Sequence, residues 1–145
     1  MPVNQCPCFN LGLAHRKVVK AYEDALAPLN LTIAQAHFLS CLYDQDQQLG
    51  KDLARLLNVD AGTLTPMIDR LARMGLVERC PHPEDRRATR ICLTDAAERL
   101  RPEVAARCQD VHDRLMSKFS KEDYERFMEL MSQLTDEAGS EAAVR

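Results

Sequence analysis

The stretch that decides the fold is residues 49–94, LGKDLARLLNVDAGTLTPMIDRLARMGLVERCPHPEDRRATRICLT. Leucine, isoleucine and methionine recur every three or four residues in two short segments, 49–57 and 61–74. That period is typical of amphipathic helices, and the N-V-D between the segments is typical of a turn. Gly75 stands where a helix stop is expected. This part therefore predicts two short helices joined by a tight turn.

The second half of the stretch changes period. Residues 76–80 and 89–93 resemble strands, and the charged segment 81–87 between them predicts the loop of a two-stranded ribbon. Helix, short turn, helix and ribbon with a basic loop make up a winged helix-turn-helix, which places its second helix in a DNA major groove. We therefore expect a mainly α fold with a small β-ribbon.

Apolar stripes with helical period continue on both sides of this module. Thr32 and Gln35 have the spacing of a capping box, which predicts another helix start. We expect one domain, 1–145, with three kinds of region: a winged helix-turn-helix over about 32–94, dimerisation helices over 9–29 and 95–134, and a tail over 135–145. Three flanking helices with apolar stripes exceed what so small a module can cover. A second copy of the chain is the expected partner, and a two-fold homodimer suits a reader of pseudo-palindromic DNA.

Composition limits the function classes. The N-terminus MPVNQCPC has neither a basic region nor an apolar run, and no segment has the ~18–20 continuous apolar residues of a membrane span. We expect a cytoplasmic protein with no membrane partner, and its six cysteines as thiols. No glycine-rich phosphate loop or other catalytic motif is present, so we expect no enzyme, no cofactor and no metal site.

The charge is unevenly distributed. The net charge is −3, but residues 51–90 hold eight basic and six acidic side chains, a balance of +2. The remainder holds 11 basic and 16 acidic side chains, a balance of −5. A basic excess on one part of an acidic chain predicts that double-stranded DNA binds at that part alone.

Two motifs carry a family resemblance. D-A-G-T-L-T-P at 60–66 and D-R-R-A-T-R-I-C-L-T at 85–94 resemble the MarR family of dimeric transcriptional regulators. Asp85, Arg87, Leu93 and Thr94 match the D-x-R…L-T pattern of the family's wing. The resemblance implies a sequence-specific regulator, and we expect a repressor. The alternative is a winged-helix module that binds protein and has no specific DNA site.

The candidate DNA contacts lie on the second helix and the wing. They are Thr63, Thr65, Pro66, Arg70, Arg73, Arg86, Arg87 and Arg90. Threonine hydroxyls in a first helical turn can bond phosphates or base edges, or else cap their own helix. Arg73 is a phosphate contact or a solvated surface charge, and Arg70 contacts DNA or braces the wing through Asp85. The family resemblance assigns insertion into the minor groove to Arg87.

A cysteine ahead of the first helix is similar to the reactive cysteine of the OhrR-type organic-peroxide sensors. By this resemblance Cys8 is the oxidised residue and Tyr22, of the same chain or of a partner subunit, is its hydrogen-bond donor, whereas the second tyrosine of the pattern falls on Ile33. A helix N-terminus favours a thiolate. The alternatives are an inert structural cysteine and, less favoured, a thiolate metal site with Cys6 and His15.

Relatives in the MarR family take small aromatic acids in a cleft between the dimerisation helices and the winged module. In this chain the cleft is expected to be lined by His15, Val19 and Tyr22. The effector is therefore expected to be a phenolic ligand or an organic hydroperoxide, and its binding or the oxidation of Cys8 would release the operator.

Overall fold

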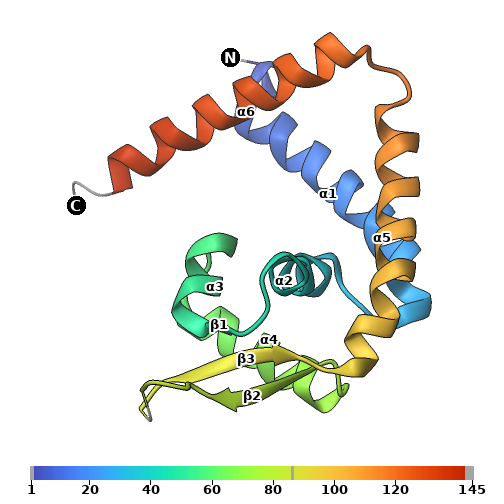
Figure 1. Cartoon of the computed structure of the whole chain (residues 1–145). Helices are drawn as coiled ribbons and strands as arrows, with labels where there is room; N and C mark the ends of the chain where they lie inside the picture. The colour runs from blue at the N-terminus through green and yellow to red at the C-terminus, as the bar shows by residue number, and fades with distance from the viewer. Residues whose placement is uncertain (1, 86, 143–145) are drawn as a thin grey trace. The chain divides into compact units, whose positions relative to one another are not determined.

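The computed structural model describes the backbone of residues 2–85 and 87–142 and the side chains up to residue 136 (Figure 1). It is mainly helical with one small sheet, as expected. In chain order the elements are η1 (Val3–Gln5), α1 (Pro7–Leu26), η2 (Ala27–Leu29), α2 (Ile33–Asp44), β1 (Gln48–Leu49), α3 (Gly50–Leu57), α4 (Ala61–Arg73), β2 (Val77–Pro81), β3 (Thr89–Leu93), α5 (Asp95–Met116) and α6 (Lys121–Ala142).

The chain forms two compact units, Met1–Gln109 and Asp110–Arg145. The first contains α1 to β3 and most of α5, and so holds the whole winged helix-turn-helix. The second contains the end of α5 and α6, which extends into the range expected to be a tail. Ser120 caps α6, because its hydroxyl accepts a hydrogen bond from the Asp123 backbone N–H at 3.1 Å.

The predicted helix signals of the module are confirmed. The Gln35 backbone N–H donates to Thr32 Oγ1 at 3.2 Å, and the Thr32 backbone N–H donates to Gln35 Oε1 at 3.0 Å, which completes the capping box. Gly75 follows α4 with φ of +72°, the left-handed conformation that glycine adopts without steric cost. These local signals fix where α2 begins and where α4 ends.

The sheet has three antiparallel strands in the order β1–β3–β2, one more than the sequence analysis predicted. Gln48 and Leu49 pair with Ile91 and Arg90 of β3, although the sequence predicts Leu49 to be the first residue of a helix. A two-residue strand is too short for side-chain alternation to be visible, so no periodicity could reveal it. β1 attaches the chain just before α3 to the wing.

The core lies within the first unit and joins α2, α3, α4 and the sheet. Its largest completely buried side chains include Phe38 and Leu39 of α2, Leu53 of α3 and Leu71 of α4, and Ile91 of β3 is 3% exposed. Each of these helices therefore buries one apolar face, which positions α4 and the ribbon relative to each other.

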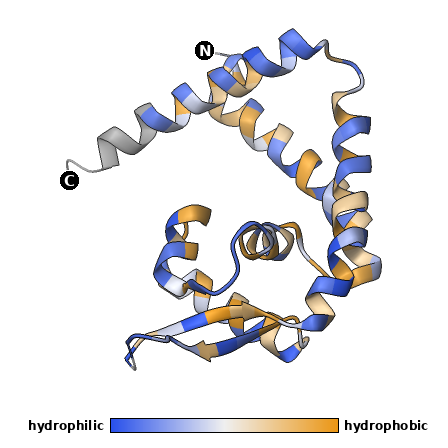
Figure 2. Cartoon of the chain, in the orientation of Figure 1, coloured by the Kyte–Doolittle hydropathy of each residue, from blue (hydrophilic) through white to orange (hydrophobic). Residues whose placement is uncertain are grey.

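The apolar stripe on α1 is only partly covered within the single chain. Leu26, at its C-terminal end, is completely buried, whereas Leu11 is 36% and Val18 is 38% exposed. Figure 2 shows apolar residues along much of α1. On α6, Phe127 and Leu134 are 52% and 44% exposed. Within the described residues no single helix is long and apolar enough to span a membrane, and residues 7–29 with 33–44 reach that length and composition only as a pair bent by 74°.

Candidate nucleic-acid interface

The turn between α3 and α4 presents the N-terminus of α4. Asn58 ends α3 in the left-handed conformation, with φ of +51°. Asp60 then caps α4: its Oδ1 accepts a hydrogen bond from the Thr63 backbone N–H at 2.7 Å. The first turn of α4 is solvent-exposed at Thr63 and Thr65. A capped, exposed helix start is a suitable element for a DNA groove.

Replacing Asp60 with alanine is expected to lower the free energy of unfolding by roughly 0.5–2 kcal/mol, because the Thr63 N–H loses its acceptor. Asp60→Asn keeps an acceptor oxygen and should retain most of the stability. Urea unfolding of the two variants beside the wild type measures this difference. Equal stability of the alanine and asparagine variants would contradict the capping role.

Thr63, Thr65 and Pro66 differ in the hydrogen-bonding groups that they leave available to DNA. Thr65 Oγ1 donates to the Ala61 carbonyl at 2.9 Å, the local bond that was the alternative to a DNA contact. Its lone pairs remain able to accept. Within the described part of the chain the Thr63 hydroxyl has no hydrogen-bond partner, so it can both donate and accept. Pro66 lies inside α4 and has no N–H, which leaves the Gly62 carbonyl without its helical donor.

Arg70 and Arg73 lie exposed in the last turns of α4. Among the described side chains neither has a carboxylate partner, so the expected brace from Arg70 to Asp85 is absent. A different pair joins α4 to the ribbon: Arg79 Nη2 of β2 donates to Asp69 Oδ1 at 2.7 Å. This brace leaves both α4 arginines available for phosphate. Sequence spacing missed it because the partners are on different elements.

The loop between β2 and β3, which we call the wing tip (residues 82–88), is organised by its own polar atoms. The backbone N–H groups of Glu84 and Asp85 both donate to His82 Nδ1, at 3.2 and 3.1 Å. Asp85 Oδ1 accepts from the Arg87 backbone N–H at 2.9 Å, which fixes the backbone while the Arg87 side chain stays exposed. Arg86, the other candidate at the tip, lies outside the described residues. Figure 2 shows the tip as hydrophilic.

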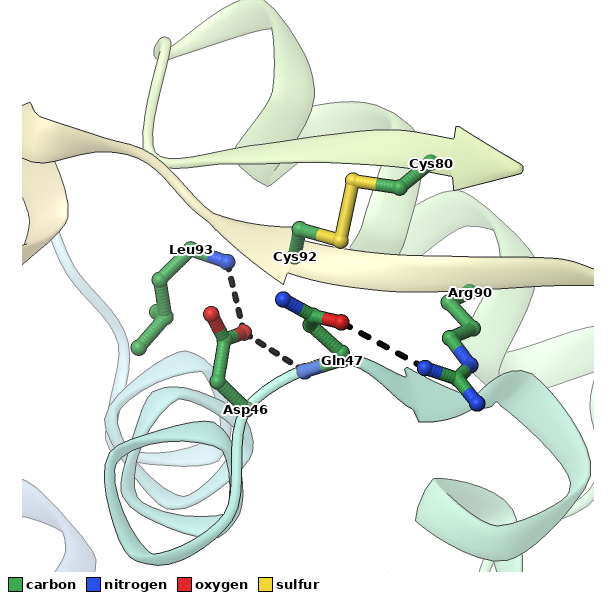
Figure 3. The surroundings of a disulfide bond; sticks show 6 residues. All are labelled: Asp46, Gln47, Cys80, Arg90, Cys92 and Leu93. Atoms are coloured by element: carbon green, nitrogen blue, oxygen red, sulfur yellow. Dashed lines mark hydrogen bonds between the residues drawn. A yellow bond between two sulfur atoms is a disulfide. The ribbon is translucent and has the colours of Figure 1, made fainter. Parts of the chain in front are cut away.

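Arg90 has a structural contact that the sequence analysis did not predict. Its Nη1 donates to Gln47 Oε1 at 3.3 Å, and Gln47 adopts φ of +61° (Figure 3). Its Nη2 lies 3.2 Å from His82 Nε2. Arg90 is half-buried and is held at the wing base by these contacts, whereas Arg87 is exposed at the wing tip. The loop that carries Gln47 is itself tied to β3, because Asp46 Oδ1 accepts from the Leu93 backbone N–H at 2.9 Å.

The expectation that all six cysteines are thiols is wrong for two of them. Cys80 of β2 and Cys92 of β3 form a disulfide, with their Cα atoms 6.2 Å apart (Figure 3). That separation is ordinary for a disulfide. The prediction relied on the expected reducing compartment and ignored how the ribbon aligns the two strands. The other four cysteines, Cys6, Cys8, Cys41 and Cys108, are free.

A cavity of about 380 Å³ opens between α1, α2 and α5 within the first unit. Of the predicted ligand-pocket residues, Tyr22 lines it, whereas His15 and Val19 do not. His15 is exposed and Val19 half-buried, two turns or less before Tyr22. The lining residues that the sequence analysis missed are Ile33, Ala36, His37, Ser40, Tyr43, Asp44, Arg101, Val104, Ala105 and Cys108.

Arg101 supplies the cationic wall of this cavity. Its Nη2 donates to the Tyr43 carbonyl at 2.9 Å, and its guanidinium lies 5.0 Å from the centre of the Tyr43 ring. The Tyr43 hydroxyl donates to the Ala97 carbonyl at 2.8 Å, which ties α2 to α5. An arginine held beside an aromatic ring can bind a ligand that combines a carboxylate with an apolar ring.

Burial, with the nearby Glu98 carboxylate, raises the pKa of Tyr43 to about 12. The folded protein therefore keeps this proton at a pH where the unfolded chain, with a tyrosine pKa of about 10, loses it. The stability due to Tyr43 should be complete below pH 10 and decline as the pH rises towards 12.

Tyr43→Phe should lower the free energy of unfolding by about 0.5–1.5 kcal/mol at neutral pH through the lost hydrogen bond. Urea unfolding between pH 9 and 12 should show a shallower decline for Tyr43→Phe than for wild type. Parallel declines would contradict this assignment.

Cys8 is exposed in the first turn of α1, immediately after Pro7. Tyr22 is on the same helix fourteen residues later, about 21 Å along the axis at 1.5 Å per residue. A hydrogen bond between them inside one chain is therefore excluded. A hydrogen bond between these two residues requires Tyr22 of another copy of the chain. Burial raises the pKa of Cys108, and burial with the Asp44 charge raises that of Cys41, so both are poor nucleophiles at neutral pH.

Comparisons with known proteins agree with this geometry. The MarR family model matches residues 31–89, which run from α2 to the first residue of β3. The regulator MgrA of Staphylococcus aureus is 33% identical over 68% of this chain and 67% of its own length. This chain belongs to the MarR family. The organic hydroperoxide resistance transcriptional regulator of Bacillus subtilis is 36% identical over 61% of the chain and 60% of its own length.

A MarR-family structure shows the same fold in a DNA complex. The crystal structure of a MarR mutant from E. coli with operator DNA has a TM-score of 0.80 and 27% identity, and covers 86% of this chain and 89% of that one. The sequence resemblance to the MarR family, with nearness to the hydroperoxide-type regulator, is thus confirmed. The relatives that match are transcriptional regulators, which are not enzymes.

Proposed function

We propose that this MarR-family chain is a homodimeric repressor that binds a pseudo-palindromic operator through α4 and the wing. The proposal rests on an exposed, capped α4 start that lies on the same module as Arg70, Arg73 and Arg87, three cations without a carboxylate partner among the described side chains. The likeness to a MarR protein bound to operator DNA supports the same reading. A module that binds an acidic protein could use the same cations, and the two cases differ because counterion release makes the affinity for duplex DNA fall steeply with salt.

The exposed apolar faces supply the argument for a dimer. Leu11 and Val18 of α1, and Phe127 and Leu134 of α6, are each at least 36% exposed in the single chain. Apolar side chains at helical spacing on two helices need a partner surface, and two-fold pairing gives each copy the same one. The dimer would set two recognition helices about one duplex turn, ~34 Å, apart.

Release from DNA has two candidate triggers. The first is an aromatic carboxylate in the α1–α2–α5 cavity, where Tyr22 and Arg101 supply an aromatic wall and a cation. The second is oxidation of the exposed Cys8, which the similarity of this chain to an organic hydroperoxide resistance regulator supports. Each would act on helices that carry the dimer and so change the spacing of the two α4 helices.

A mobility-shift assay on the chain's own promoter tests this proposal. It is run without effector, with an organic hydroperoxide, with a reducing agent and with phenolic acids. We expect a specific protein–DNA complex that dissociates when at least one class of effector is added. Light scattering should show a dimer at micromolar concentration. A monomer, or no complex with promoter DNA, would overturn the proposal. Persistence of peroxide release in Cys8→Ser would remove Cys8 as the trigger.

A further inference from the structure

The disulfide at the base of the wing is not used by the proposed function. It joins β2 to β3 twelve residues apart in sequence and encloses the whole wing tip, with Arg87 inside the closed loop. In the strand register Cys80 lies opposite Arg90, and Cys92 lies opposite Glu78. The two cysteines are therefore diagonal neighbours on one face of the ribbon, placed by the pairing itself rather than by a distant contact.

The two cysteines differ in their exposure to solvent. Cys80 is half-buried, so part of its surface is open to solvent. Cys92 is only 5% exposed. An oxidant from solution therefore meets Cys80 first, and Cys92 is the sheltered thiol that closes the bridge.

We propose that Cys80 and Cys92 form a reversible dithiol–disulfide site that senses hydroperoxides and sets the rigidity of the wing. The inference rests on the proposed function, because it regulates the same DNA-binding wing. In the reduced protein the Cys80 thiolate attacks the peroxide oxygen and forms a sulfenic acid, and the alcohol leaves. The Cys92 thiolate then attacks the Cys80 sulfur, and water leaves. Two thiols lose two electrons in total, the hydroperoxide gains them, and a dithiol reductant reverses the step.

The effect on DNA follows from what else holds the tip. With the bridge closed, the strand pairing runs without interruption from Val77–Leu93 to Pro81–Thr89. Beyond it, the tip relies on exposed hydrogen bonds such as that from the Arg87 N–H to Asp85. Reduction removes the covalent tie, so more ordering has to occur when Arg87 enters a groove. We expect the reduced protein to bind operator about threefold to tenfold more weakly than the oxidised one. Oxidation of the wing pair is thus expected to strengthen operator binding, whereas oxidation of Cys8 is expected to release the operator. The opposite effects on affinity distinguish the two sites.

The test uses the full chain with Cys6→Ser and Cys8→Ser, which leaves the wing pair intact. The protein is reduced, treated with cumene hydroperoxide, blocked with N-ethylmaleimide and digested with trypsin. Cleavage after arginine places Cys80 in peptide 80–86 and Cys92 in peptide 91–99, so only a disulfide keeps them together. Operator affinity is measured in parallel on both redox states.

We expect the linked peptide pair only after oxidation, its loss with dithiothreitol, and the stated gain in affinity on oxidation. In the same background Cys80→Ser should abolish both the linked pair and the redox response, while Cys41→Ser as a matched control should keep both. Two alkylated peptides after oxidation, or equal affinity of the two states, would overturn the inference. Failure of every form to bind duplex would overturn the proposed function and the regulatory role with it, while the peptides would still decide the cysteine site.

Discussion

Replacing Leu71 with alanine is expected to lower the free energy of unfolding by about 2–5 kcal/mol. Leu71 is completely buried on the inner face of α4, in the core shared with α2, α3 and the sheet. Removing its isobutyl group loses the transfer free energy and leaves a cavity that a packed core fills only partly. Because small domains are stable by only about 5–15 kcal/mol, this is a large fraction of the total.

Leu56→Ala is the matched control for this prediction. Leu56 is on the neighbouring helix α3 but is 62% exposed, so its truncation should change stability by less than about 0.5 kcal/mol. Urea unfolding followed by circular dichroism at one fixed protein concentration compares the two variants, since a dimer's stability depends on concentration. If Leu71→Ala is no less stable than Leu56→Ala, the described core is wrong.

Arg87→Ala is expected to weaken operator binding by roughly 1–3 kcal/mol, about fivefold to 150-fold, without changing the fold. The Arg87 side chain is exposed at the wing tip, and its backbone N–H is already bonded to Asp85. The guanidinium is thus presented on a fixed backbone, where a narrow minor groove attracts it. Truncation removes that contact and leaves the Asp85 hydrogen bond intact.

The control removes the same charge elsewhere. Arg99 is exposed near the start of α5, outside α4 and the wing, so Arg99→Ala should change operator affinity by much less. Fluorescence anisotropy on a labelled duplex measures the Kd of both variants. Stable folding of Arg87→Ala with wild-type affinity would remove Arg87 from the interface.

Local signals explain how much of this fold the sequence predicts. The capping box at Thr32 and the Gly75 stop depend on neighbours in sequence, so they mark α2 and α4 correctly. Strand β3 was predicted with its observed bounds because its five residues follow a clear β pattern. β1 was missed, since two residues carry no period and their pairing with β3 is decided by tertiary contacts.

The candidate DNA interface shows the same difference between features set by sequence neighbours and features set by tertiary contacts. The sequence predicted Thr63, Arg73 and Arg87 as surface residues of the winged helix-turn-helix, and all three are exposed in the structure. It missed the Asp69–Arg79 brace and the contact between Arg90 and Gln47, which join elements through space. It also missed the Cys80–Cys92 bridge. Aligning the two strands would have shown the cysteines as diagonal neighbours, but the expected reducing compartment was given more weight.

In the proposed complex α4 and the wing bind duplex DNA, with the α4 arginines on phosphates. The Kd for a pseudo-palindromic promoter duplex, measured as a function of salt, is the direct test. Each phosphate contact contributes a slope of about −0.9 to log K against log salt. A dimer that places Arg70 and Arg73 of each copy on phosphates neutralises four phosphates and should therefore give a slope of about −4 or steeper. A slope near zero, or no binding to duplex at low salt, would contradict the account and favour a protein-binding module.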